Sequence, residues 1–406
     1  MKILHFAHTF IPFYGGTTTR LINLLSDTRN DHYLYVPMPD YKNTPNNVKH
    51  LKYREDFSNI KVRRCKLFKI FKIKIPIFKM LLENKINSNI LIKSVKEEDF
   101  DIAHGHNPLA FATTAMKFAK KKDIPLIYEI HRLSYGAPIN EKWKYVSNFF
   151  HSLKQRLFLP MEKKVLTNAD VIIVHSKTVR RHLISIFGID ENNIRVIPNG
   201  IDSNKFNPNN WHKMGKELRR TRDWNNKVIF MYNGFLNDFT GIGFFLDSIK
   251  ELPYSVKKRI KVLVIGRGML QKNIENMSNK KESNIEYLGL INHNDMPKYY
   301  CASDVHVIPL IWNSNIPTKL LEGMAMEKIV LASNASGIKE ILKNNKNGII
   351  FNKGNKKDLL KKIGYIVNNI DKMNNIRKQA RKDVVEKYDW GKFRQQLQKI
   401  YTNLVK

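Results

Sequence analysis

The sequence predicts an α/β protein with two doubly wound, parallel-sheet domains. Residues 2–7 have the pattern of a buried strand, which runs into the glycine pair Gly15-Gly16 and then an amphipathic helix. The same strand–turn–helix pattern starts again at residues 227–234. A chain of 406 residues has room for two domains, each with a full hydrophobic core.

A sharp bend is predicted between these domains. Residues 195–202 contain a proline and an Asn-Gly pair, and both favour a tight turn. We therefore expect an N-terminal domain at residues 1–200, a second domain at 201–385, and a closing helix at 386–406 that packs back on the first domain. Further expected elements are strands at 100–108, 125–131, 171–176 (the last of the first domain), 261–268, 284–290 and 304–310, a long helix at 141–168, and a polar loop or linker at 203–226.

Composition limits the class of protein and its partners. The two cysteines offer no disulfide framework, and no run approaches the roughly 20 apolar residues that span a bilayer, so a cytoplasmic protein is expected. The net charge of +34 favours anionic partners, although a lysine-rich solvated surface would also account for it. Nucleic acid is not an expected partner, because no zinc-finger, RNA-recognition or basic-zipper pattern is present.

The most informative stretch is residues 314–326, which follow a strand. Asn315 suits the N-cap of a helix and Pro317 suits its first turn. The N–H groups of Thr318, Lys319 and Leu320 would then point out of the helix end, where they favour an anion. Glu322 lies on the same helix face as Lys319 and could accept hydrogen bonds from a sugar or ribose diol. The stretch predicts a nucleotide-diphosphate site with a hydroxyl-binding carboxylate.

Read on through residue 341, this stretch resembles the donor-binding signature of the retaining, GT-B-type glycosyltransferases of family 4. The resemblance covers nearly the whole chain and implies two Rossmann-like domains that face a cleft. It also implies transfer of a sugar from a nucleotide-diphosphate sugar to a hydroxyl acceptor, with no metal or other cofactor. Glu322, Lys319 and His131 would be catalytic. The donor-side positions that it implies are Gly15, Gly16, Asn233, Gly234, Gly266, Arg267, Leu290, Ser314, Thr318 and Leu320.

The chain departs from the family pattern at three places. Phe235 stands where an arginine usually grips the diphosphate, and Thr240 stands where a lysine usually does. Ser314 replaces the first of two glutamates. A charge-assisted hydrogen bond to phosphate contributes roughly 1.5–3 kcal/mol, so the missing cations matter. Arg267 or Lys319 could supply a substitute charge.

Three histidines lie at or near predicted strand ends, where ligands bind in open α/β sheets. His131 ends the strand at 125–131, and the resemblance implies that it contacts the donor sugar or phosphate; a strand-end histidine bonded to nearby backbone is the alternative. His104 and His106 share one strand face. The sequence shows no third ligand near them, so no metal site is expected, and the resemblance places His106 on the acceptor side.

A basic, aromatic segment follows residue 60. Its exposed-looking positions Lys66, Phe68, Lys69, Phe71 and Lys72 are suited to an anionic membrane interface, which favours a lipid-linked acceptor and a peripheral location on the inner face of the membrane. The alternative is an ordinary strand over residues 67–77 with a solvated basic face.

Two rival functions remain open at this point. The missing cations and the missing first glutamate would also suit a sugar-nucleotide-binding subunit without catalysis. The charge alone would suit a nucleic-acid-binding protein, whose binding would depend steeply on salt. The donor's sugar and base, the linkage and the acceptor are not specified by the sequence.

Overall fold

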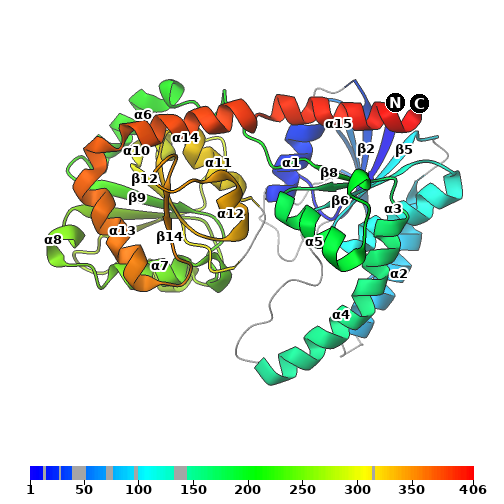
Figure 1. Cartoon of the computed structure of the whole chain (residues 1–406), viewed down its shortest axis with the longest axis horizontal. Helices are drawn as coiled ribbons and strands as arrows, with labels where there is room; N and C mark the ends of the chain where they lie inside the picture. The colour runs from blue at the N-terminus through cyan, green and yellow to red at the C-terminus, as the bar shows by residue number, and fades with distance from the viewer. Residues whose placement is uncertain are drawn as a thin grey trace. The chain divides into compact units, whose positions relative to one another are not determined.

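The computed structural model describes residues 1–11, 15–26, 29–38, 52–69, 76–95, 99–131, 144–312 and 316–406. The chain forms two compact units (Figure 1). The first unit is Met1–Pro198 together with Gly391–Lys406, and the second is Asn199–Trp390. The predicted boundaries at 200 and 385 lie within a few residues of these.

The first unit contains an eight-stranded sheet in the order β3-β4-β2-β1-β5-β6-β7-β8. Its neighbouring strands pair in parallel except β3 and β4, which are antiparallel. The strands are β1 (Lys2–Phe6), β2 (Asp31–Pro37), β3 (Arg54–Phe57), β4 (Ile60–Cys65), β5 (Ile102–His106), β6 (Leu126–Ile130), β7 (Val171–Val174) and β8 (Ile194–Val196). The helices are α1 (Gly16–Leu25), α2 (Pro76–Ser94), α3 (Leu109–Lys122), α4 (Lys144–Thr167), α5 (Lys177–Phe187) and α15 (Trp390–Val405).

The two faces of this sheet differ in chemistry. Leu4, Ala103 and Tyr128 belong to one hydrophobic cluster, which includes residues of α3. Side chains alternate along a strand, so His5 and Glu129 are on the opposite face. Both are buried. The first sheet therefore carries a buried polar layer as well as an apolar core.

The second unit contains a six-stranded, all-parallel sheet in the order β11-β10-β9-β12-β13-β14. Its two faces are covered by two separate hydrophobic clusters. The strands are β9 (Val228–Asn233), β10 (Ile260–Ile265), β11 (Ile285–Gly289), β12 (Val305–Ile308), β13 (Ile329–Ser333) and β14 (Ile349–Phe351). The helices are α6 (Pro208–Thr221), α7 (Ile242–Ile249), α8 (Tyr254–Lys257), α9 (Gln271–Ser278), α10 (Met296–Ala302), α11 (Thr318–Ala325), α12 (Ser336–Ile341), α13 (Lys356–Asn369) and α14 (Asn374–Lys387).

Two predictions near the junction were wrong. The strand at 171–176 is not the last of its sheet, because β8 pairs with β7 in parallel. The tract 203–226 is not a loop, because it contains α6. This helix starts with Asn207 as N-cap and Pro208 in the first turn. Its Gly215 lets it pack closely on α10, since a Cβ there would lie 2.5 Å from the Cβ of Cys301.

The basic segment after residue 60 also differs from the strand that was the alternative to a membrane-binding segment. Strand β4 ends at Cys65, residues 67–69 are not in a strand, and residues 76–77 are in α2, so the strand alternative is wrong at these positions. Residues 70–75 lie outside the described residues. Lys66, Phe68 and Lys69 are exposed, whereas Phe71 and Lys72 lie outside the described residues. Within the described parts of the chain, no helix is both long and apolar enough to cross a bilayer.

Candidate functional site

In the second unit, Lys319 connects the start of α11 to the end of β9. Its ammonium donates a hydrogen bond to the backbone carbonyl of Asn233 over 3.0 Å. It also lies 4.3 Å from the centroid of the Tyr232 ring. Burial lowers the pKa of Lys319 from 10.5 to about 8, although the nearby Glu322 opposes this shift. A cation is thus fixed at the carboxyl edge of the sheet, where parallel α/β sheets bind ligands.

Glu322, one turn further along α11, is buried and already has two hydrogen-bond partners. Its Oε1 lies 3.0 Å from His293 Nε2, and its Oε2 accepts from the Tyr300 hydroxyl over 2.9 Å. His293 is about one-third exposed, while the Glu322 side chain is only 6% exposed. A carboxylate oxygen has two lone pairs. A ligand hydroxyl would therefore share Oε1 with His293 or take the place of His293.

The start of α11 differs from the prediction. Pro317 is the N-cap, with an extended backbone and no capping side chain, and Asn315 and Ser314 lie outside the described residues. Leu320 is buried, and its N–H donates to the Pro317 carbonyl over 2.9 Å, so it is not available to a ligand. The N–H groups of Thr318 and Lys319 have no partner among the described residues. The helix end therefore offers two N–H groups rather than three.

The other predicted donor positions of this unit lie on adjacent strand ends. Gly234 and Gly266 both have positive φ, and a Cβ on Gly266 would lie 1.9 Å from the Gly234 carbonyl oxygen. Only glycine allows this close approach. Arg267 is exposed, and Leu290 is 68% exposed just after β11.

Sequence reasoning missed the polar side chains that surround Asn233. The Asn233 side-chain oxygen lies 2.8 Å from His306 Nε2 and 3.3 Å from the Tyr300 hydroxyl. Tyr300 thus joins Asn233 to Glu322. Burial raises the pKa of Tyr300 well above its usual value, and Glu322 adds to this effect. The one signal in the sequence was His306, a histidine inside an otherwise apolar strand.

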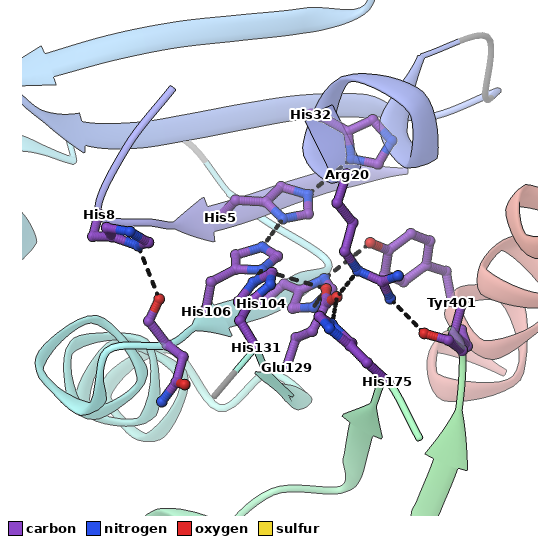
Figure 2. A network of polar contacts seen from close by, with 12 residues as sticks. His5, His8, Arg20, His32, His104, His106, Glu129, His131, His175 and Tyr401 are labelled. Atoms are coloured by element: carbon purple, nitrogen blue, oxygen red, sulfur yellow. Dashed lines mark hydrogen bonds and ion pairs between the residues drawn. The ribbon is translucent and has the colours of Figure 1, made fainter. Parts of the chain in front are cut away.

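In the first unit, the predicted residues His131 and His106 belong to a buried polar network around Glu129 (Figure 2). Arg20 of α1 forms an ion pair with Glu129 Oε1, and both side chains are 1% exposed. His175 Nε2 lies 3.1 Å from the same oxygen. His104 Nε2 and His106 Nδ1 lie 3.2 and 3.3 Å from Oε2. Four charged or polar side chains thus converge on one carboxylate.

A row of four histidines extends from this network. His32 Nδ1 lies 2.9 Å from His5 Nε2, and His5 Nδ1 lies 3.1 Å from His106 Nε2. His106 Nδ1 lies 3.2 Å from His131 Nε2. The half-buried His131 follows β6 directly and is the most exposed member of the row. The structure therefore brings the predicted acceptor-side and catalytic histidines into direct contact.

Burial determines the charge of this network. Burial by itself would raise the pKa of Glu129, but Arg20 and the hydrogen bonds from the histidines outweigh it and hold the pKa well below its usual range. Burial lowers the pKa of His32 to about 3 and those of His104 and His175 to about 4. It also lowers the pKa of His5 and His131 well below 6.5. These five imidazoles are consequently neutral near pH 7.

The reason for expecting no metal does not hold. His5 lies beside His104 and His106, and Glu129 and His131 lie beside His106, so the described residues contain two groups of three side chains that could hold a metal ion. Strands far apart in sequence supply them, which is why the sequence showed no third ligand.

The remaining predicted positions of the first unit are Gly15 and Gly16 at the start of α1. Gly15 has an extended backbone, with φ −161°, and a Cβ on either glycine would meet no atom of the described residues within 4 Å. The described residues around these two positions therefore do not require glycine. A small pocket nearby in the chain is lined by His8, Thr9, Phe10, Ile11, Val36, Pro37 and Arg64.

Comparisons with known proteins identify the family of the chain. Residues 14–205 match the family described as Glycosyltransferase Family 4, and residues 216–383 match Glycosyl transferases group 1. An uncharacterised glycosyltransferase of Methanocaldococcus jannaschii, MJ1069, is 23% identical over 100% of this chain and 99% of its own length. The alpha-monoglucosyldiacylglycerol synthase of Acholeplasma laidlawii is 21% identical over 94% of this chain and 92% of its own.

The fold has also been seen in solved structures. Anabaena Alr3699/HepE in complex with UDP-glucose aligns over 100% of both chains, with a TM-score of 0.76 and 17% sequence identity. This similarity confirms the predicted fold class of two parallel-sheet α/β domains.

Proposed function

Since the chain belongs to the GT-B glycosyltransferases of the group 1 and family 4 type, we propose that it transfers a sugar from a nucleotide-diphosphate sugar to a hydroxyl acceptor, with retention at the anomeric carbon. The observation that carries this proposal is the position of Lys319, whose ammonium lies at the end of β9 and one helical turn from Glu322. A diphosphate needs such a cation, and a sugar or ribose needs such a carboxylate.

The residues of the second unit would act mainly on the leaving group. When the bond from the anomeric carbon to the phosphate oxygen breaks, negative charge develops on the diphosphate. Lys319 and the N–H groups at the start of α11 are fixed donors that would stabilise this charge without reorganisation. The acceptor oxygen would form its bond to the anomeric carbon on the face from which the diphosphate leaves, and the proton of the acceptor hydroxyl would pass to the departing phosphate oxygen. Because these donors stabilise the negative charge of the leaving group, the proposed reaction involves no metal or other cofactor.

In the first unit, His131 would contact the donor and His106 would lie behind it. His131 is half-buried at the end of β6, and its ring is neutral near pH 7. A neutral imidazole can donate one hydrogen bond to a sugar hydroxyl or phosphate oxygen and accept another. Gly15 and Gly16 would allow the ligand to approach the start of α1.

The acceptor is proposed to be a glycan or a lipid-linked molecule at an anionic membrane surface. Lys66 and Lys69 are exposed on either side of Phe68, which is itself 50% exposed. Basic and aromatic side chains in this arrangement suit the headgroup region of a membrane. The matched synthase of Acholeplasma laidlawii has a glycolipid product by its name, which supports an acceptor of this class. The protein would then act on the inner face of the membrane.

A sugar-nucleotide-binding subunit without catalysis is the second candidate. Phe235 is 60% exposed at the position where an arginine is expected, and Thr240 hydrogen-bonds to the Phe235 and Asn237 carbonyls rather than facing a phosphate. Lys319 would then be the main cation for the diphosphate.

Titration with a panel of nucleotide sugars, followed by transfer and hydrolysis assays, tests these proposals. We expect Lys319→Ala and Glu322→Ala each to weaken donor binding or turnover at least tenfold. Lys361→Ala, an exposed lysine of α13, is the matched control and should change neither. Unchanged donor binding and rate in both site variants would refute the site. Donor binding without transfer or hydrolysis would favour the subunit.

A further inference from the structure

The buried network of the first unit contains a single anion, Glu129, and six imidazoles in contact with it or with each other. A neutral imidazole carries one proton on one of its two nitrogens, and the other nitrogen is a bare acceptor. Two bare nitrogens, or two N–H groups, cannot face each other at hydrogen-bond distance. The contacts therefore restrict which nitrogen of each ring is protonated.

Glu129 decides the rings that touch it. An ionised carboxylate only accepts hydrogen bonds, and its negative charge favours a proton on each ring nitrogen near it. His104 Nε2 and His106 Nδ1 lie 3.2 and 3.3 Å from Oε2, although neither makes a well-aligned hydrogen bond to it and His104 Nε2 has no other partner among the described residues. His175 Nε2, which hydrogen-bonds to Oε1 at 3.1 Å, must therefore carry a proton, and the carboxylate charge favours protons on His104 Nε2 and His106 Nδ1 as well. The bare Nδ1 of His104 then accepts from the Tyr401 hydroxyl, which lies 3.0 Å away.

The consequence extends along the row of histidines. A His106 ring that carries one proton, on Nδ1, has a bare Nε2, which accepts from His5 Nδ1. His5 then has a bare Nε2, which accepts from His32 Nδ1. On the other side, His131 Nε2 faces the His106 Nδ1–H and must be bare. A neutral His131 ring then carries its proton on Nδ1.

We propose that Glu129 is a positioning residue that fixes the protonated nitrogen of every histidine in this row, so that His131 is held as the Nδ1–H form. Glu129 does not touch the ligand site itself; it acts through His106. Arg20 keeps Glu129 in place, since its guanidinium also donates to the carbonyls of Ile197 and Pro198 over 2.9 and 2.7 Å.

A resident metal ion explains the same cluster less well. A divalent cation between His106, Glu129 and His131 would replace the hydrogen bonds that already satisfy these ring nitrogens. It would also add two positive charges beside Arg20, whose charge Glu129 already balances. Burying charge without a counter-ion is costly. The hydrogen-bonded arrangement contains no unbalanced charge.

In the enzyme, a His131 ring with its proton fixed on Nδ1 would offer one defined hydrogen-bond donor. Protonating Nε2 as well would place its N–H against the N–H of His106. This consequence rests on the proposed function, whereas the protonation pattern does not. A ring locked in one form is pre-organised for a neutral hydroxyl or phosphate oxygen of the donor.

Nitrogen-15 NMR of histidine-labelled protein at pH 7 tests the pattern directly, because protonated and bare ring nitrogens have well-separated chemical shifts. We expect the wild-type protein to show Nδ1–H forms for His5, His32, His106 and His131, and Nε2–H forms for His104 and His175. An Nε2–H form of His131 or His106 in the wild-type protein would overturn the proposal, whatever the activity.

Glu129→Gln sharpens the test. With the glutamine oxygen kept toward Arg20, its amide group donates toward His104 and His106, so the protonated nitrogen of His106 should reverse, and those of His5, His32 and His131 with it. Tyr401→Phe, which removes only the partner of His104, should leave His131 unchanged. Reversal in Tyr401→Phe, or no reversal in a folded Glu129→Gln protein, would contradict the assignment.

Two further measurements separate the explanations. Stoichiometric zinc in the purified protein, with His106 and His131 signals that shift on chelation, would replace the proposal by a metal centre. If the pattern and its reversal are found, donor turnover in Glu129→Gln should fall at least tenfold with the Michaelis constant for the acceptor unchanged. If no variant or wild-type protein turns over any donor, only the proposed function fails, and the NMR result stands.

Discussion

Acidification should destabilise the first unit much more than the second. His32, His104 and His175 have pKa values of about 3, 4 and 4 in the folded protein, against 6.5 for an exposed histidine. Because the folded values are lowered, the unfolded chain binds more protons between pH 6.5 and about 4. Stability is therefore highest above pH 6.5 and falls as the pH drops through this window.

The size of the effect follows from the number of protons. Each histidine that is protonated only in the unfolded chain contributes about 1.4 kcal/mol per pH unit, so three contribute roughly 4 kcal/mol per unit near pH 5. Two further histidines, His5 and His131, have strongly lowered pKa values and would steepen the slope. Domains have total stabilities of about 5–15 kcal/mol, so one or two pH units should unfold this unit.

Hydrogen exchange measured by mass spectrometry at several pH values can follow the two units separately, after correction for the intrinsic pH dependence of exchange. Amides of β6 report on the first unit, and amides of β10 report on the second unit. In the second unit, His306 is the histidine with a strongly lowered pKa. The second unit should therefore lose only about 1.4 kcal/mol per pH unit. His175→Asn, which keeps a hydrogen-bond donor, should reduce the slope of the first unit by about the same amount. Equal slopes in the two units, or a flat profile between pH 6.5 and 5, would refute the reasoning.

Three other outcomes are expected. Because the Lys319 pKa is about 8 in the free protein, donor affinity measured by calorimetry should fall as the pH rises from 7 to 9. Lys319→Arg should flatten this dependence. A flat wild-type profile would show that the Lys319 ammonium does not bind the donor. Gly266→Ala should lower the free energy of unfolding by roughly 2 kcal/mol or more, because the residue has positive φ and its new Cβ would lie 1.9 Å from the Gly234 carbonyl oxygen. Gly364→Ala in α13 is the control: its new Cβ would meet no described atom within 4 Å, so it should be neutral or slightly stabilising. In vesicle sedimentation, binding to anionic but not neutral lipid should weaken about fivefold for each of Lys66→Ala and Lys69→Ala; no binding to either lipid would remove the membrane proposal.

The fold could be predicted where its strands are long and apolar. Buried parallel strands such as β9 and β10 appear in the sequence as continuous runs of apolar residues, and the glycine turns after them mark the strand ends. Strand β8 was missed because it has only three residues, one of them the exposed Arg195. Helix α6 was missed because most of its residues are polar and its one fully buried residue is Gly215, although its few apolar residues lie on one face.

The candidate site could be predicted only in part, for a different reason. Lys319 and Glu322 were identified because both are near the start of one helix, and local spacing indicates their shared face. Their partners His293, Tyr300 and Asn233 come from other elements and are brought close only by the fold. The same holds for Arg20 and Glu129, which are 109 positions apart.

The position of Lys319 bears on the two cations that the family pattern predicts and this chain lacks. The ammonium lies beside Gly234, within 3.0 Å of where a Cβ would be, directly before Phe235. Lys319, a cation on α11, is therefore placed at the turn where the family pattern predicts two cations from other loops. Two missing charge-assisted bonds would cost roughly 3–6 kcal/mol of donor binding, and Lys319 can restore at most about half of this. Its lowered pKa makes even this contribution depend on pH. Weak, pH-dependent donor affinity that vanishes in Lys319→Ala would show that one lysine serves in place of two cations, whereas tight binding in that variant would require another phosphate contact, with the exposed Arg267 as the first residue to examine.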